Sequence, residues 1–213
     1  MKSGKRKVNK KKVRKFILIL VLIVVLLFIA IWQGKQLLFP EKVAQTVKVV
    51  DKIDEYGYSL NENETEYYKS LFKKLKKELS KESYDEEKYA SLISQLFLAD
   101  FYSLNNSINK NDVGGMQYVY EPFQSDFVNL AKESVYSTVE NNIYGDRKQK
   151  LPTVSEVVVN EIRQESYEYG EKTDETAYTI DLTIKYKEDM GYQEDATLNI
   201  IHTDKKLEIV EMK

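Results

Sequence analysis

The sequence predicts an α+β fold attached to one N-terminal transmembrane helix. The first observation is a run of seventeen apolar residues, Phe16–Trp32, that follows a strongly basic N-terminus. The second is a spacing of three to four residues between apolar side chains from about residue 62 to 139, which is typical of amphipathic helices. The third is an alternation of apolar and polar residues beyond Pro152, which is typical of strands with one buried face. Helices followed by strands predict an α+β arrangement.

Residues 16–34 form the predicted transmembrane helix. They contain no charged side chain, and a helix of this length is roughly 28 Å long, close to the hydrocarbon thickness of a bilayer. The apolar run is longer than that of a cleaved signal peptide, and no small-residue cleavage site follows it. An uncleaved signal anchor is therefore the favoured interpretation, with a cleaved signal peptide as the alternative.

The charge of residues 1–15 predicts the orientation of this helix. This basic arm holds no acidic residue. Its topogenic residues include Lys10, Lys11, Lys12, Arg14 and Lys15. Because basic flanks stay in the cytoplasm, we expect the N-terminus inside and residues 35–213 outside the cell membrane. We expect the arm to contact lipid headgroups of the bilayer and not nucleic acid.

The remaining chain has the opposite charge. Residues 35–213 hold 23 basic and 34 acidic side chains, a net charge of −11. An acidic domain is a poor match for polyanions such as DNA. The chain contains no cysteine, which suits an exported bacterial protein, particularly from a Gram-positive-type bacterium, better than a disulfide-bonded ectodomain.

The part outside the membrane divides into a connector, residues 35–58, and one α+β domain, residues 59–213. The helical spacing of Val43, Val47, Val50 and Ile53 predicts a stalk helix over 42–58. Three further helices are expected. They are Glu62–Leu79 with Asn61 or Asn63 as N-cap, Ser83–Asn105 with a Ser83–Glu86 capping box, and Pro122–Gly145.

Four strands are expected after Pro152. They are Val154–Tyr169, Ala177–Lys187, Gln193–Thr203 and Lys206–Met212. Short turns between consecutive strands predict an antiparallel meander with one wet face. The helices must then cover the apolar face, and Ser83–Asn105, with the widest apolar stripe, is expected to be the central helix.

Two or three helices on a four-stranded meander resemble the nuclear transport factor 2-like cone fold. With one N-terminal transmembrane helix, the order of elements over residues 16–213 is similar to bitopic scaffold subunits of conjugation and type IV secretion systems. It is also similar to membrane-proximal domains of some cell-wall synthesis proteins. The resemblance implies protein contacts rather than catalysis, and it assigns no functional residue.

Asp100 is the first candidate for a site residue, with Tyr102 beside it. Asp100 lies near the apolar stripe of Ser83–Asn105, where a carboxylate has a raised pKa or a partner. In a cone-fold enzyme it would be a base in the cavity. The favoured alternative is a structural Asp bonded to a loop amide or a tyrosine hydroxyl.

Tyr118 and Tyr120 are the second pair of candidates. They follow Gly114-Gly115 in a polar loop, and we expect them to be exposed contacts because tyrosine suits protein interfaces. The only histidine, His202, is expected to face solvent on a strand, with Asp204 as a conceivable partner. One histidine without cysteine cannot make an ordinary zinc site, and no cofactor or metal is expected.

The favoured function is a membrane-anchored, non-enzymatic protein-interaction or scaffold domain outside the cytoplasmic membrane. Its partner would be another membrane or envelope protein, in a conjugation, secretion or cell-wall assembly. A sensor domain that binds a small ligand or lipid in an apolar cone cavity is the alternative. An enzyme ranks third because no acid–base pair is visible in the sequence.

Overall fold

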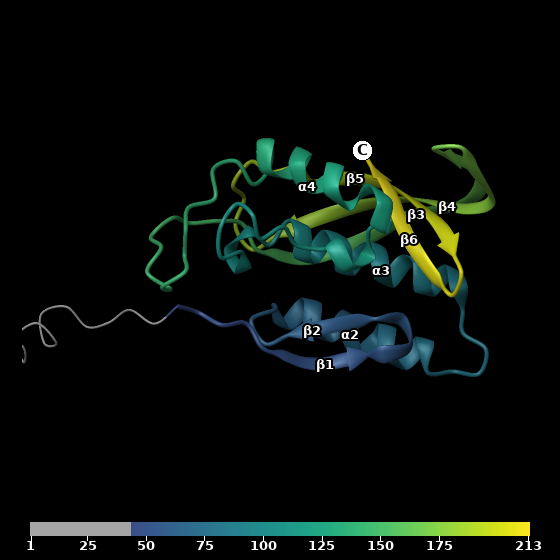
Figure 1. Cartoon of the computed structure of the whole chain (residues 1–213), viewed down its shortest axis with the longest axis horizontal. Coiled ribbons are helices and arrows are strands. Elements are labelled where there is room, and N and C mark those ends of the chain that lie inside the picture. The colour runs from purple at the N-terminus through teal and green to yellow at the C-terminus, as the bar shows by residue number, and fades with distance from the viewer. Residues whose placement is uncertain (1–43) are drawn as a thin grey trace, which may run out of the picture. The chain divides into compact units, whose positions relative to one another are not determined.

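The computed structural model describes residues 44–213. In chain order, the strands and α-helices are β1 (Val49–Ile53), β2 (Tyr58–Asn61), α2 (Glu66–Leu79), α3 (Glu86–Phe101), α4 (Gln124–Glu133), β3 (Val154–Tyr169), β4 (Lys172–Tyr186), β5 (Asp195–Thr203) and β6 (Lys206–Met212). Helix α3 lies between the β1–β2 hairpin with α2 on one side and the four-stranded sheet on the other (Figure 1). The predicted α+β class is confirmed.

The basic arm and the predicted transmembrane helix, residues 16–34, lie outside the described residues. Helix α3 is the longest described helix, with 16 residues. In the part of the chain from residue 44 onward, no helix combines the length and the apolar character that crossing a membrane requires.

Residues 49–61 form a β-hairpin, so the stalk helix predicted over 42–58 is wrong. Strands β1 and β2 pair antiparallel, and Gly57 closes the turn with a φ of +68°, a conformation that favours glycine. The valines and the isoleucine whose spacing indicated a helix are β-branched, and such side chains fit strands better than helices.

Helices α2 and α3 confirm two predicted helices but begin at different caps. The Thr65 hydroxyl and the Asp85 carboxylate each accept a hydrogen bond from the main-chain N–H three residues on, both at 3.1 Å. The predicted caps Asn61, Asn63 and Ser83 are wrong, because the cap is the polar residue directly before the first helical turn. Helix α3 buries its apolar side chains against α2 and the sheet, as expected of the central helix.

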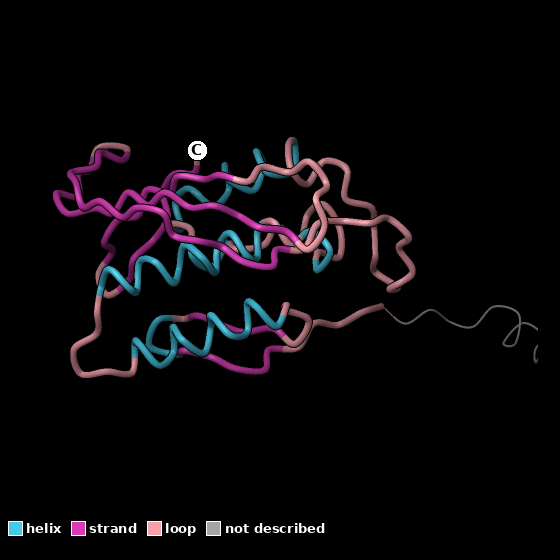
Figure 2. Tube along the Cα trace, turned by 180° about the vertical axis from the view of Figure 1, so that it is seen from behind, coloured by secondary structure: helices cyan, strands magenta, loops and turns pink. Residues whose placement is uncertain are grey.

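The sheet has the strand order β3-β4-β5-β6, with every neighbouring pair antiparallel. The predicted meander is therefore confirmed, and β3 and β6 have the predicted bounds. Strand β4 begins at Lys172 instead of Ala177, because the β3–β4 hairpin continues past β5 to a tight turn at Gly170. The end of this hairpin extends beyond the rest of the sheet (Figure 2).

The segment between α3 and β3 is mostly irregular (Figure 2). The helix predicted over Pro122–Gly145 is shorter, since α4 ends at Glu133. Beyond it, the buried Tyr136 donates a hydrogen bond to the main-chain oxygen of Phe101 at 2.7 Å. This contact holds the chain against the end of α3, and the first part of the same segment forms one wall of a cavity.

Candidate functional site

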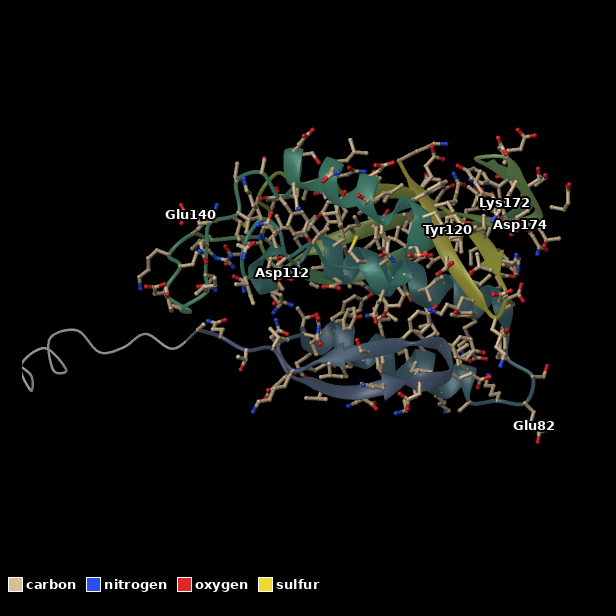
Figure 3. All side chains as sticks on the ribbon, viewed as in Figure 1. Glu82, Asp112, Tyr120, Glu140, Lys172 and Asp174 are labelled. Atoms are coloured by element: carbon tan, nitrogen blue, oxygen red, sulfur yellow. The ribbon has the colours of Figure 1, made fainter. Side chains whose placement is uncertain are left out.

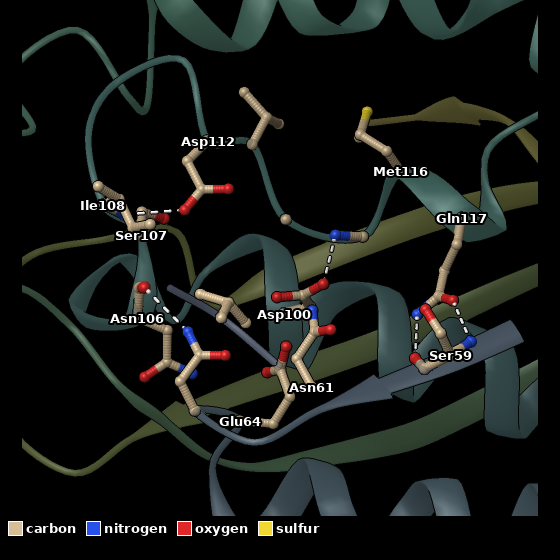
Figure 4. A pocket seen from close by; sticks show the side chains of 15 residues that line it. Ser59, Asn61, Glu64, Asp100, Asn106, Ser107, Ile108, Asp112, Met116 and Gln117 are labelled. Atoms are coloured by element: carbon tan, nitrogen blue, oxygen red, sulfur yellow. Dashed lines mark hydrogen bonds between the residues drawn. The ribbon is translucent and has the colours of Figure 1, made fainter. Parts of the chain in front are cut away.

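A cavity of about 420 Å³ lies between the end of β2, the start of α2 and the loop after α3 (Figure 4). This volume is within the range of small-molecule sites. Polar side chains from Asn61, Glu64, Asp100, Asn106, Asp112 and Gln117 face it. The cavity thus differs in chemistry from the apolar cavity that the cone-fold resemblance implies.

Glu64 is the most unusual group in the cavity wall. It lies just before the Thr65 cap of α2, and its side chain is buried, with 8% of the residue exposed. Its Oε2 atom has no hydrogen-bond partner among the described residues. Burial, followed by the charge of Asp100, raises the pKa of Glu64 to about 8, although the nearby amides of Asn106 and Asn61 favour the ionised form. At neutral pH the carboxyl group is therefore mostly protonated.

Asp100 lies at the end of α3 and holds the facing loop. Its Oδ2 accepts a hydrogen bond of 2.6 Å from the main-chain N–H of Gly115. Burial raises the pKa of Asp100 to about 6, the Gly115 hydrogen bond lowers it, and the charge of Asp112 raises it. Of the alternatives predicted for Asp100, the structure shows the bond to a loop amide, and Asp100 also lines the cavity.

Gly114 and Gly115 let this loop approach α3 closely. A Cβ atom on Gly114 would lie 2.6 Å from the main-chain oxygen of Asp100. At Gly115, where φ is +81°, a Cβ atom would lie 2.6 Å from the ring of Phe97. Both contacts are too short for real Cβ atoms, so only glycine places the Gly115 N–H within reach of Asp100.

Gln117 and Arg147 hold the two ends of the same loop. The Gln117 side chain accepts from the Ser59 N–H at 2.8 Å and donates to the Ser59 oxygen at 3.1 Å, as a paired strand would. The Arg147 guanidinium donates to the main-chain oxygens of Ser107 and Asn105, each at 2.9 Å. These contacts make the cavity wall a supported loop.

The other predicted candidates do not line the cavity. Tyr102 and Tyr118 are buried, and their hydroxyls bond to Gln193 and Tyr68 at 3.2 and 2.8 Å. The expectation that Tyr118 is an exposed contact is therefore wrong, because the loop turns its ring into the core. Tyr120 is partly exposed and accepts a hydrogen bond from Lys172 at the hairpin end (Figure 3).

His202 lies in a second polar cluster that the sequence did not reveal. Its Nδ1 lies 2.8 Å from Asp174 Oδ2 on β4, and its Nε2 lies 2.7 Å from Glu86 Oε1 at the start of α3. His202 was expected to face solvent, but its side chain is only 31% exposed, and its partners are Asp174 and Glu86 instead of the conceivable Asp204. Burial favours the neutral ring, but the hydrogen bonds to Glu86 and Asp174 outweigh burial and raise the pKa of His202.

Glu64 and Asn106 were not recognised as site residues in the sequence. Glu64 falls inside the helix predicted over Glu62–Leu79, where it counts as a polar-face residue. The only local signal is the Thr65 cap, which places Glu64 just outside α2 and allows its side chain to turn inward. Comparison of this chain with protein-family models, with characterised proteins and with solved structures finds no match, so the cavity itself must indicate the function.

Proposed function

We propose that residues 44–213 bind a small polar molecule outside the cytoplasmic membrane, where residues 16–34 anchor them. The observation that carries the proposal is the buried carboxyl group of Glu64, whose Oε2 atom has no hydrogen-bond partner among the described residues, in a cavity of small-molecule size. A buried polar atom without a partner costs about 1–3 kcal/mol. A bound ligand that supplies the missing hydrogen-bond partner would offset this cost.

The anchored location is supported by the basic arm and the apolar run of the N-terminus. The nuclear transport factor 2-like assignment is likewise a proposal, supported by helices that cover a four-stranded antiparallel meander. Neither proposal is needed for the cavity to bind a ligand. The anchored location determines only which side of the membrane supplies the ligand.

The test uses the full-length chain in detergent micelles and a panel of amino sugars, amino acids, polyols and sugar acids. We expect at least one compound to raise the melting temperature of the wild-type chain and of Glu62→Gln, but not of Glu64→Gln. Glu62 is the matched control because it is exposed and does not line the cavity. Equal responses from all three proteins across the panel would exclude the cavity as the binding site.

A scaffold function is the second candidate, and β1 favours it. Val47, Val49 and Val50 are 42–55% exposed, and β1 pairs with β2 on one side only within the described residues. An open apolar edge can accept a strand from a partner protein. A stoichiometric protein that co-purifies with the wild-type chain and is lost when Val49 is replaced by Lys would favour this function.

A further inference from the structure

The charges on the cavity wall point to the class of ligand. The lining contains no lysine, arginine or histidine, whereas Glu64, Asp100 and Asp112 bring three carboxyl groups. The charges of Asp100 and Asp112 both act on Glu64, so the three groups lie close enough to interact. A wall of this composition favours a positively charged ligand over an anion.

The unpartnered atoms indicate what else the ligand carries. Figure 4 shows the Glu64 side chain reaching toward Asp100 across the cavity wall. Besides Glu64 Oε2, the buried Nδ2 of Asn106 makes no hydrogen bond of good geometry among the described residues, although the Asn106 amide is close enough to Glu64 to lower its pKa. The carboxylate is an acceptor when ionised, and the amide nitrogen is a donor. One ligand satisfies both atoms if it combines a donor group with an oxygen that accepts.

An organic cation fits this wall better than a metal ion. Among residues 44–213, no three His, Cys, Asp or Glu side chains are arranged to hold a metal ion. Metal ligands lie at about 2.0–2.6 Å from Mg²⁺ or Ca²⁺, so one ion would fill little of a cavity of about 420 Å³. The aliphatic side chains of Val47, Val113 and Met116 also line the cavity and suit a short carbon frame.

We infer that the cavity binds a small organic amine that also carries a hydroxyl or carbonyl oxygen. The ammonium group donates to Glu64 and Asp100, and the oxygen accepts from Asn106. This inference rests on the proposed function and deepens it by naming the class of ligand.

Binding of an amine is expected to release a proton to the buffer. The groups that interact electrostatically with Glu64 are Asp100 from α3, Asp112 from the loop and the buried hydroxyls of Tyr68 and Tyr118. With the pKa of Glu64 raised to about 8, its carboxyl group is mostly protonated at neutral pH, and an adjacent ammonium ion favours ionisation. As the pH is raised toward that pKa from below, the affinity for the amine therefore increases by up to about tenfold per pH unit.

The experiment compares three compounds with the same chain length: 4-amino-1-butanol, 1,4-butanediol and 4-hydroxybutanoate. They are titrated calorimetrically into the full-length chain in two buffers with different ionisation enthalpies. We expect the amine to bind at least about tenfold more tightly than the diol and to release a proton, and we expect 4-hydroxybutanoate not to bind. Glu64→Gln should lower the affinity for the amine at least about tenfold and abolish proton release, whereas Glu62→Gln should change neither.

Several results would overturn the inference alone. One is that the diol or 4-hydroxybutanoate binds with the same affinity as the amine and that this binding depends on Glu64. Another is that Ca²⁺ binds more tightly than the amine in a Glu64-dependent way. A third is that only neutral or anionic compounds of the wider panel bind. Asp100→Asn serves as a second variant if Glu64→Gln does not fold, because asparagine keeps an acceptor for the Gly115 N–H. If neither the three compounds nor the panel bind, the proposed function fails with the inference.

Discussion

At the residue scale, the buried carboxyl group of Glu64 suits the proposed ligand but lowers the stability of the ligand-free protein. A carboxyl group that is 8% exposed and lies near Asp100 is destabilised in its ionised form. The pKa of Glu64 rises from 4.5 to about 8 on folding. The folded chain therefore holds a proton that the unfolded chain gives up. The contribution of Glu64 to stability is full below about pH 4.5 and is lost as the pH rises through about 8.

We predict that Glu64→Gln stabilises the ligand-free protein, and more so at higher pH. Relative to wild type, the gain in unfolding free energy should grow from little at about pH 5 to roughly 2–4 kcal/mol at about pH 9. Denaturant unfolding of both proteins across this range measures it. A gain that is independent of pH would mean that Glu64 is not protonated in the folded chain.

At the element scale, His202 joins α3 to the sheet. Both ring nitrogens lie within 2.8 Å of carboxylate oxygens, and both can donate only when the ring is protonated. The main-chain N–H of His202 also donates to Asp174 at 2.7 Å. We call the contact of His202 with Asp174 and Glu86 the His202 clamp. Because the pKa of His202 is raised, the stability that this clamp contributes is complete below about pH 6.5 and is lost as the pH rises through the higher pKa of the folded protein.

We predict that His202→Gln destabilises the protein mainly at low pH. The loss should be about 1 kcal/mol near pH 6, because the partly exposed carboxylates are screened by solvent, and it should shrink toward pH 9. Unfolding of wild type and variant at both values measures it. The sign distinguishes this effect from that of Glu64, since removing Glu64 stabilises at high pH. An equal loss at both values would contradict a protonated clamp.

At the scale of the whole molecule, charge is divided between two parts. The first 34 residues hold nine basic and no acidic side chains, and the rest carries a net charge of −11. This asymmetry supports the proposed orientation, in which the arm stays in the cytoplasm and the acidic domain lies outside. The proposed amine ligand would then come from outside the cell.

Because the chain contains no cysteine, single cysteines can report this orientation. We predict that Glu171→Cys, in the exposed turn of the β3–β4 hairpin, reacts with a membrane-impermeant maleimide on intact protoplasts. Ser3→Cys, in the basic arm, should react only after permeabilisation. The opposite pattern, or a mature chain that begins after Gln36, would contradict the anchored topology.

The agreement between the elements predicted from the sequence and those in the structure differs from element to element. Strands β3 and β6 match their predicted bounds, because alternation over many residues is a strong local signal. The pattern over residues 42–58 predicts a helix where β1 lies, because a few β-branched residues fit both spacings and only the partner strand decides between them. The sequence indicates Asp100 as a candidate because a carboxylate beside an apolar stripe is visible within one helix. The raised pKa of Glu64 depends on burial and on the charge of Asp100, and the His202 clamp depends on Asp174 and Glu86, which lie 28 and 116 residues away in the chain.

The sequence by itself determined the α+β class, the central helix and the meander, because periodicity and capping act over neighbouring residues. It also determined the division of charge on which the proposed topology rests. The tertiary structure decided that Glu64, Asp100 and Asn106 share one cavity and that Tyr118 is buried. These facts depend on how distant segments pack, since the cost of burying a charge depends on surroundings that no local pattern records.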